Sequence, residues 1–188
     1  MDLYHPVFSL LLEISFIEKF CCHKQQEKGR YIKIFEELER SVVITLKNDD
    51  VKVLQEVQKN TKMAMKAIDA ISDKIFDDNL AMHVTRESMK YADIYNKATD
   101  RLLDGKAASY RESGFQDLML KNGVRANTMF NTSTSHIAEV MIQGSNRGLT
   151  SMWKAINHNE RAGSVSMEIA KELMDFEEKN IEKLKQYL

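Results

Sequence analysis

The sequence has little of what turns, cross-links and charged binding surfaces require. Its 188 residues include one proline and seven glycines, which argues against collagen, disorder and most all-β folds, because these need frequent turn residues. The 27 basic and 28 acidic residues nearly balance, so we expect no nucleic-acid partner and no anionic membrane held by a basic excess. With 43% hydrophobic residues, the composition predicts one globular, mostly helical domain.

Cysteine and long apolar runs are also scarce. The two cysteines, Cys21 and Cys22, are adjacent, so a disulfide between them would be strained and would close no useful loop. The lack of a disulfide framework favours the reducing cytoplasm. The apolar run over 7–20 is broken by Glu13 and Glu18 and lacks the features of a secretory signal. We therefore predict a cytoplasmic protein without a membrane segment.

A compositional break near residue 46 divides the chain. Residues 1–45 hold the proline, both cysteines and six aromatic residues. One interpretation is an N-terminal extension over 1–45 that precedes a bundle domain over 46–188. The other is a start assigned too early, because the codons for 39–41 can spell a purine-rich ribosome-binding sequence and Leu46 follows at a suitable distance. Both interpretations stay open at this point.

From Asn48 onward, apolar residues recur at steps of three and four, the period of a helix with one buried face. The first stripe is Leu54, Val57, Thr61, Ala64, Ile68, Ile71 and Ile75. The second is Leu80, Val84, Glu87, Tyr91, Ile94, Ala98 and Leu102. The third is Ile137, Val140, Met141, Gly144, Gly148, Met152 and Ile156, and the last is Met167, Ala170, Leu173, Glu177, Ile181, Leu184 and Leu188. These stripes predict an all-α, up-down-up-down four-helix bundle.

Capping residues predict where three of these helices begin or end. Asn48 and Asp49 offer side-chain oxygens to the first helix, and Ser164 offers one to the last. Gly105 suits the left-handed backbone that often ends a helix, here the second.

The segment over 112–158 allows two interpretations. The polar run over 131–135 has low helix propensity, because its side chains compete for backbone hydrogen bonds. Either a short helix precedes a long one, or a single helix is kinked near Ser133. Gly144 and Gly148 lie one turn apart, which predicts a notch where another helix approaches closely.

A helical bundle can hold a metal between its helices, bound by carboxylates and Glu-x-x-His pairs. The acids and histidines in or beside the stripes are His83, Glu87, His136, Glu139 and Glu177. His83 and Glu87 share a helix face, as do His136 and Glu139. However, the order His-x-x-Glu is reversed, and the first stripe carries Thr61 instead of an acid. We therefore expect structural or solvated roles and no cofactor, with an iron or manganese site as the alternative.

The C-terminal part resembles a known kind of protein. The residues concerned are Met-Ile-Gln-Gly-Ser-Asn-Arg-Gly-Leu-Thr-Ser-Met over 141–152, then Ala170, Leu173, Glu177, Ile181 and Leu184. They resemble the C-terminal hairpin of ferritin-like bundles, above all small bacterial proteins of unknown function whose hairpin begins Met-Ile-x-His-His and which are associated with copper. The resemblance implies a ferritin-like architecture. Gly144 and Ser145 stand where that motif has its histidines, so its metal ligands are absent.

The motifs of common enzyme classes are missing as well. The sequence has no phosphate-binding glycine loop, no dinucleotide fingerprint after a strand and no serine elbow. We therefore expect a non-catalytic, cytoplasmic bundle that acts through protein contacts, as a homo-oligomer or with another protein. The alternative is a di-iron or di-manganese protein or oxidoreductase that uses the five acids and histidines named above.

Overall fold

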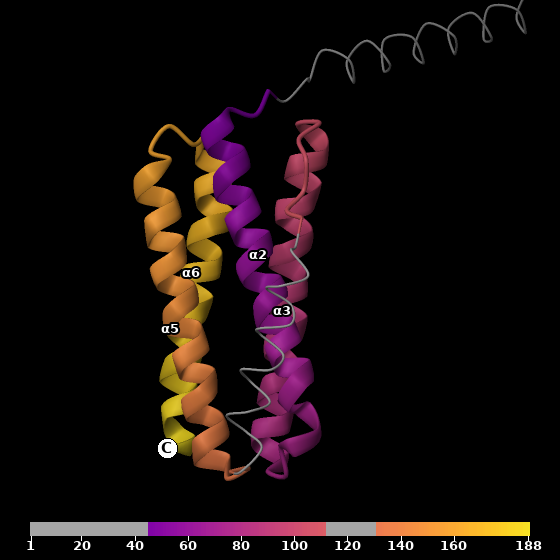
Figure 1. The fold of residues 1–188 in the computed structure, drawn as a ribbon, viewed down its shortest axis with the longest axis vertical. Helices are drawn as coiled ribbons and strands as arrows, with labels where there is room; N and C mark the ends of the chain where they lie inside the picture. The colour runs from indigo at the N-terminus through magenta and orange to yellow at the C-terminus, as the bar shows by residue number, and fades with distance from the viewer. Residues whose placement is uncertain (1–44, 112–130) are drawn as a thin grey trace, which may run out of the picture. The chain divides into compact units, whose positions relative to one another are not determined.

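The computed structural model describes residues 45–111 and 131–188. In these ranges the chain forms four α-helices and two 3-10 turns, without a strand. The elements are α2 (Asn48–Ile71), η1 (Ser72–Lys74), α3 (Asp78–Asp104), α5 (Thr134–His158), α6 (Ser164–Leu184) and η2 (Lys185–Tyr187). Figure 1 shows the four helices side by side. The predicted all-α four-helix bundle is confirmed for this part of the chain, while the up-down-up-down order and the ferritin-like architecture stay predictions.

The described helices belong to one compact unit, Thr45–Leu188. The predicted extension over 1–45 lies outside the described residues except for Thr45, and the short helix predicted after residue 112 lies outside them too. No helix within 45–111 or 131–188 combines the length and apolar character needed to cross a membrane.

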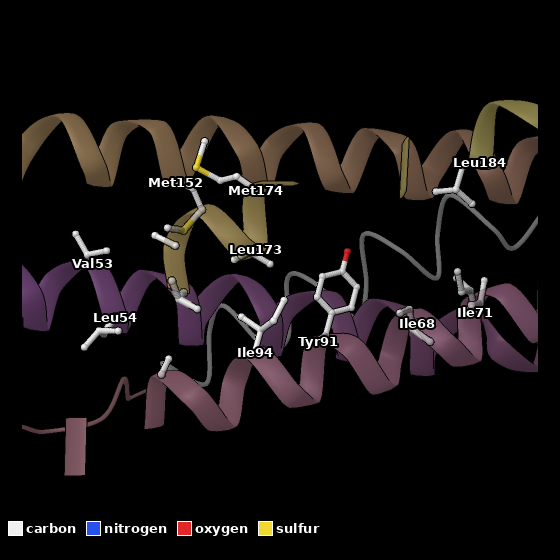
Figure 2. Packing of buried hydrophobic residues seen from close by; sticks show 14 of the residues in the cluster. Val53, Leu54, Ile68, Ile71, Tyr91, Ile94, Met152, Leu173, Met174 and Leu184 are labelled. Carbon is white, nitrogen blue, oxygen red and sulfur yellow. The ribbon is translucent and has the colours of Figure 1, made fainter. Parts of the chain in front are cut away.

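The core follows the predicted stripes most closely on α2 and α3. All seven stripe residues of α3 are buried, and on α2 the stripe is buried except at half-buried Ala64 and at Ile75, which follows η1. Figure 2 shows Ile94 of α3 close to Leu173 of α6 in this core. Each fully buried Leu or Ile contributes about 1.5–3 kcal/mol through the hydrophobic effect. Such contacts position the polar groups that the same helices carry inward.

The buried face of α5 differs from the prediction by one position. Ser145 is buried, whereas Gly144 is exposed and has no atom within 4 Å of the place where a Cβ would stand. Ile137 and Met152 are buried as predicted. The error arises because the middle of this stripe consists of glycine and polar residues. Without large apolar residues there, the helical period does not show which residue of each turn faces inward. Leu188, predicted to end the last stripe, is 64% exposed.

The start of α2 corrects the predicted cap. Lys47 is the N-cap, and the Asp50 carboxylate accepts a hydrogen bond from its N–H at 2.9 Å. The same carboxylate accepts one from Gly163 N–H at 2.7 Å, while Asp49 accepts one from Arg161 N–H at 3.2 Å. The acids at this helix start therefore hold the loop that precedes α6.

The end of α3 also differs from the prediction. Gly105 has an ordinary φ of −82°, and it is Lys106 that adopts the left-handed region, with φ 52°. Ala107 N–H donates to the carbonyl of Leu102 at 2.8 Å, as in the Schellman motif. Glycine is needed at 105 for space, because a Cβ there would lie 2.5 Å from Leu46 Cδ1.

The polar run before α5 ends in a cap. Ser133 is the N-cap, and its hydroxyl accepts a hydrogen bond from His136 N–H at 3.3 Å. Residues 131–133 are not helical, so the single helix kinked near Ser133 is wrong. For the last helix, Gly163 is the N-cap and Ser164 is already helical, which corrects the predicted cap by one residue.

Candidate functional site

Two carboxyl groups lie inside the bundle. Glu87 of α3 is 2% exposed and Glu177 of α6 is 3% exposed. Both occupy positions of an apolar stripe, so helix periodicity directs them inward with their apolar neighbours. A buried carboxylate is costly unless hydrogen bonds or opposite charge compensate for the lost hydration. The hydrogen-bonding partners of each acid therefore decide whether its carboxyl group is charged or neutral.

Glu177 has good hydrogen-bonding partners. Tyr91 Oη donates to Glu177 Oε2 at 2.8 Å, and Ser145 of α5 also bonds this carboxyl group. The Tyr91 ring is held edge-on against Phe176, with ring centroids 5.0 Å apart. Burial raises the pKa of Glu177, and the hydrogen bonds from Ser145 and Tyr91 oppose that rise. Burial and the charge of Glu177 raise the pKa of Tyr91 well above its usual value, so Tyr91 remains a donor.

Glu87 is poorly compensated. Its Oε1 lies 2.7 Å from His83 Nε2, which is also 3.0 Å from Asn180 Oδ1. Among the described residues, neither the Glu87 oxygens nor Asn180 Nδ2 makes a hydrogen bond of good geometry, although Asn180 lies close enough to Glu87 to lower its pKa. Burial raises the pKa of Glu87 to about 7, and burial lowers the pKa of His83. Both shifts favour uncharged forms, so the geometry is that of a buried neutral pair more than of a salt bridge.

The two glycines of the predicted notch differ in their surroundings. A Cβ on Gly148 would lie 3.5 Å from Glu177 Oε1 and 3.4 Å from Asn60 Oδ1, which are ordinary contact distances. The Asn60 amide donates to Glu56 Oε1 at 3.1 Å, and Ser151 of α5 donates to the same oxygen. Gly148 therefore lies beside polar side chains of α2 and α6 without an unusually close approach, while exposed Gly144 faces open space.

The structure divides the five predicted metal ligands into two groups. His83, Glu87 and Glu177 belong to the buried cluster, in which the charge of Glu177 acts on Glu87. His136 and Glu139 share a face, as predicted, with Nδ1 and Oε2 3.4 Å apart, but the Glu139 side chain is 55% exposed. Within the described ranges, no three side chains of His, Cys, Asp or Glu gather closely enough to hold a metal ion.

Sequence reasoning missed two members of the buried cluster. Asn180 is 2% exposed and lies one turn after Glu177 on α6. Ser145 is 7% exposed and occupies the turn of α5 that faces Glu177. The sequence did hold a signal that could have identified Asn180, which is a polar residue one turn after an acid of the apolar stripe. For Ser145 the wrong phase of the α5 stripe concealed the signal.

The buried cluster is built as an interior network. Its donors and acceptors come from α3, α5 and α6 and form two groups, His83 with Glu87 and Asn180, and Glu177 with Tyr91 and Ser145. Two surface cavities of about 470 and 390 Å³ lie along α2 and α5, and neither is lined by Glu87, Glu177 or Tyr91. The arrangement can hold or exchange a proton inside the bundle, but these cavities give a substrate no route to it.

The outer face of α3 carries a different feature, a row of exposed apolar side chains. Met82, Met89 and Leu103 are 49%, 69% and 61% exposed. They lie at heptad spacing, which places them along one line of the helix. Together with the exposed residues between them they form what we call the α3 seam. The α3 seam consists of Met82, Arg86, Met89, Asp93, Asn96, Asp100 and Leu103.

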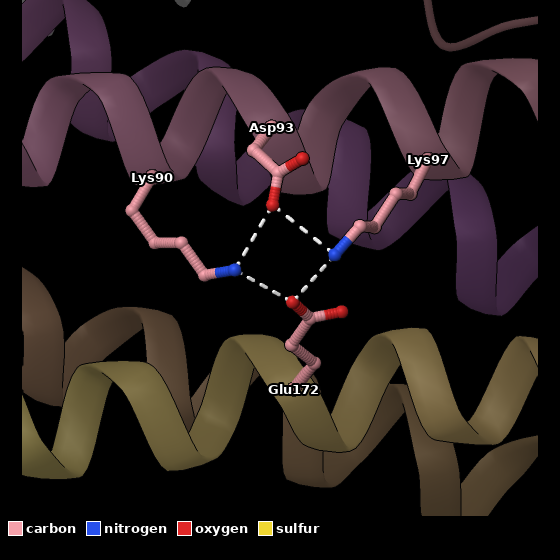
Figure 3. A network of polar contacts seen from close by, with 4 residues as sticks. All are labelled: Lys90, Asp93, Lys97 and Glu172. Carbon is pink, nitrogen blue, oxygen red and sulfur yellow. Dashed lines mark hydrogen bonds and ion pairs between the residues drawn. The ribbon is translucent and has the colours of Figure 1, made fainter.

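Charges border the α3 seam in a closed network. Lys90 and Lys97 of α3 each contact both Asp93 and Glu172 of α6, at 2.7 to 3.1 Å between nitrogen and oxygen. Figure 3 shows the four side chains as a ring that joins the two helices. The hydrogen bonds from the lysines lower the pKa of Asp93 and of Glu172. The groups are largely exposed, so the network contributes more to the arrangement of charge than to stability.

The chain was compared with protein-family models, with curated proteins and with solved structures. None of the three comparisons found a significant match.

Proposed function

We propose that this chain is a ferritin-like, cytoplasmic helical bundle that acts without catalysis through contacts with proteins, copies of itself among them. The observation that carries the proposal is the α3 seam. Single exposed apolar residues are common on protein surfaces, but here three large ones share one heptad line of α3, which Asn96 interrupts between Met89 and Leu103. Two of them are methionines, whose flexible side chains adapt to a partner surface.

The interior supports the same proposal. The buried acids bind side chains of their own chain, Tyr91 and Ser145 for Glu177 and His83 for Glu87. Their role is then to fix how α3, α5 and α6 pack, since a buried polar network favours one arrangement of its helices. The ferritin-like architecture rests on the resemblance of residues 141–152 and on inward-facing acids at the middle of two helices.

Metal binding is the second candidate, and one observation favours it. Glu87 is buried beside His83 with both oxygens short of well-formed hydrogen bonds, and a carboxylate and an imidazole side by side are groups that can bind a metal ion. A dinuclear iron or manganese centre nevertheless fits poorly, because such centres in bundles draw on all four helices. Here α2 contributes Thr61 to the interior and α5 contributes Ser145, while His136 and Glu139 are at the surface.

One preparation separates the two candidates. The full chain, purified without a histidine tag, would be analysed for bound metals and by sedimentation velocity over a range of concentrations. We expect a mass above that of the monomer that increases with concentration, and iron and manganese far below one ion per chain. Iron or manganese at one ion per chain that survives dialysis against a chelator would contradict the proposal and support the alternative.

A further inference from the structure

The residues of the α3 seam follow a regular spacing. From Met82 to Leu103 the steps alternate between four and three, which is the spacing of a coiled-coil contact line. One series holds the apolar residues Met82, Met89 and Leu103 together with the polar Asn96, and the other holds the charged residues Arg86, Asp93 and Asp100. All are exposed. Arg86 makes its one hydrogen bond among the described residues to the sulfur of Met82, and Asp100 makes none there. Both charges are thus available to a partner.

The order of these charges is self-complementary. Arg86 and Asp100 lie at equal distances on either side of Asp93. If a second α3 ran antiparallel about a two-fold axis at Asp93, Arg86 would face Asp100 of the second copy, and the reciprocal pair would form at the other end. In the alternate series, Met82 would lie within one residue of the position opposite Leu103 of the second copy, and Met89 would lie within one residue of the position opposite Asn96. Symmetric self-contact of this type is the commonest form of homodimer.

We propose that a second copy of this chain docks on the α3 seam in the antiparallel orientation, with the two-fold axis at Asp93. The inference rests on the proposed function. It adds the α3 seam as the surface, a second copy of the chain as the partner, and the antiparallel orientation of the two α3 helices. A parallel pair is disfavoured because it would place Arg86 against Arg86 and Asp100 against Asp100.

The axis itself brings two copies of Asp93 together. Each Asp93 carboxylate is held between two lysines of its own chain, 2.9 Å from Lys90 Nζ and 3.1 Å from Lys97 Nζ (Figure 3). The negative charge at the axis is therefore balanced within each subunit. The same lysines bind Glu172, so α6 holds them in the position that the contact requires.

The strength of the contact follows from its size. The line from Met82 to Leu103 extends about 32 Å at about 1.5 Å per residue, but it is one helix wide. It buries less than the roughly 800 Å² per subunit of a standard stable interface. We therefore expect a dimer that dissociates on dilution. The apolar residues supply most of its affinity, and the exposed charge pairs determine its direction.

A charge-exchange experiment tests the orientation. The dimer dissociation constant of the full chain would be measured by sedimentation velocity at low salt for Arg86→Asp, Asp100→Arg and the double variant. Each single variant creates two like-charge contacts and should weaken the dimer about tenfold, while the double variant should return to within about threefold of the parent. Arg147→Asp makes the same charge change at an exposed position of α5 and should leave the constant unchanged.

Each outcome decides for or against the inference. A chain that is monomeric at every concentration overturns it. A double variant as weak as the singles overturns the antiparallel orientation, yet the wider proposal of protein contacts survives, because self-association is still present. Met89 is 69% exposed, so Met89→Lys should disrupt the dimer but not the fold. If this variant keeps both its thermal unfolding transition and the dimer, then a different face is the interface and the inference is wrong.

Discussion

Replacing Glu87 by glutamine should make the stability of this protein less dependent on pH. Burial raises the pKa of Glu87 from 4.5 to about 7, so the folded chain binds a proton more tightly than the unfolded chain does. A raised pKa stabilises the folded state fully below about pH 4.5, and this stabilisation is lost as the pH rises through about 7. Between pH 5 and pH 8 the loss amounts to about 2.5 kcal/mol, at about 1.4 kcal/mol per pH unit. Glutamine has nearly the same shape and never ionises.

Other groups around Glu87 titrate as well, which is why the variant must be compared with the parent at each pH. The raised pKa of Glu177 acts in the same direction as that of Glu87. The lowered pKa of His83 acts in the opposite direction, because stability that depends on a neutral histidine is lost as the pH falls. Lys183 also acts on Glu87 and lowers its pKa. These contributions largely cancel in the difference between Glu87→Gln and the parent.

The measurement is urea unfolding at pH 5 and pH 8, followed by circular dichroism. Relative to the parent, Glu87→Gln should gain about 2–3 kcal/mol between the two pH values. Glu168→Gln provides the matched control, because Glu168 is exposed on α6 and undergoes the same chemical change; it should show no comparable gain between the two pH values.

Two results would refute this reasoning. An equal difference at pH 5 and pH 8 would mean that Glu87 keeps its ordinary pKa. A loss of about 3 kcal/mol or more at pH 8 would mean that Glu87 is ionised and paired there, since breaking a buried pair leaves an uncompensated charge. Repeating the second case with a chelator present would separate a pair with His83 from a bound metal.

Four further substitutions test particular contacts by thermal unfolding. Gly144→Ala should stabilise α5 by up to about 1 kcal/mol, because the position is exposed and open. Gly148→Leu should destabilise the fold, because Asn60 and Glu177 occupy the space that the leucine side chain would need. Equal effects of the two substitutions would contradict this expectation. Tyr91→Phe removes the hydroxyl that donates to Glu177 and should lower the free energy of unfolding by about 1–3 kcal/mol. A change below about 0.5 kcal/mol would show that another donor replaces the tyrosine hydroxyl. Asp50→Ala should lower the free energy of unfolding by about 1–2 kcal/mol at neutral pH and by less in acid. The pKa of Asp50 is lowered in the folded state, so its carboxylate stabilises the fold only while it is ionised. A loss of stability that does not depend on pH would contradict the capping role of the Asp50 carboxylate.

How much the sequence predicts depends on how strongly each helix is patterned. The stripe on α3 is uninterrupted, and all of its residues are buried as predicted. On α5 the middle of the stripe is glycine and polar residues, and Ser145 faces inward where Gly144 was expected. At the start of α2 the bond from Lys47 to Asp50 is local, whereas the bond from Gly163 to Asp50 joins a distant loop and could not be predicted from local sequence.

The same limits apply to the candidate site. Glu87 and Glu177 were found because each replaces an apolar residue in a clear stripe. For His136 and Glu139 the shared face was predicted correctly, but periodicity on α5 was too weak to show that this face points to solvent. The poor hydrogen bonding of Glu87 depends on the orientations of His83 and Asn180 around it, which residue spacing does not contain.

The bond from Gly163 to Asp50 has a consequence for the order in which the chain folds. It joins residues 113 positions apart, so the start of the first described helix obtains this stabilisation only after nearly the whole chain has been made. Contacts over such long separations form late, because the loop between them must close first. During synthesis, α2 and α3 can pair early through their own contacts, for example the bond from Gln58 to Thr99. The first turn of α2 then stays frayed until the loop before α6 leaves the ribosome and closes onto it.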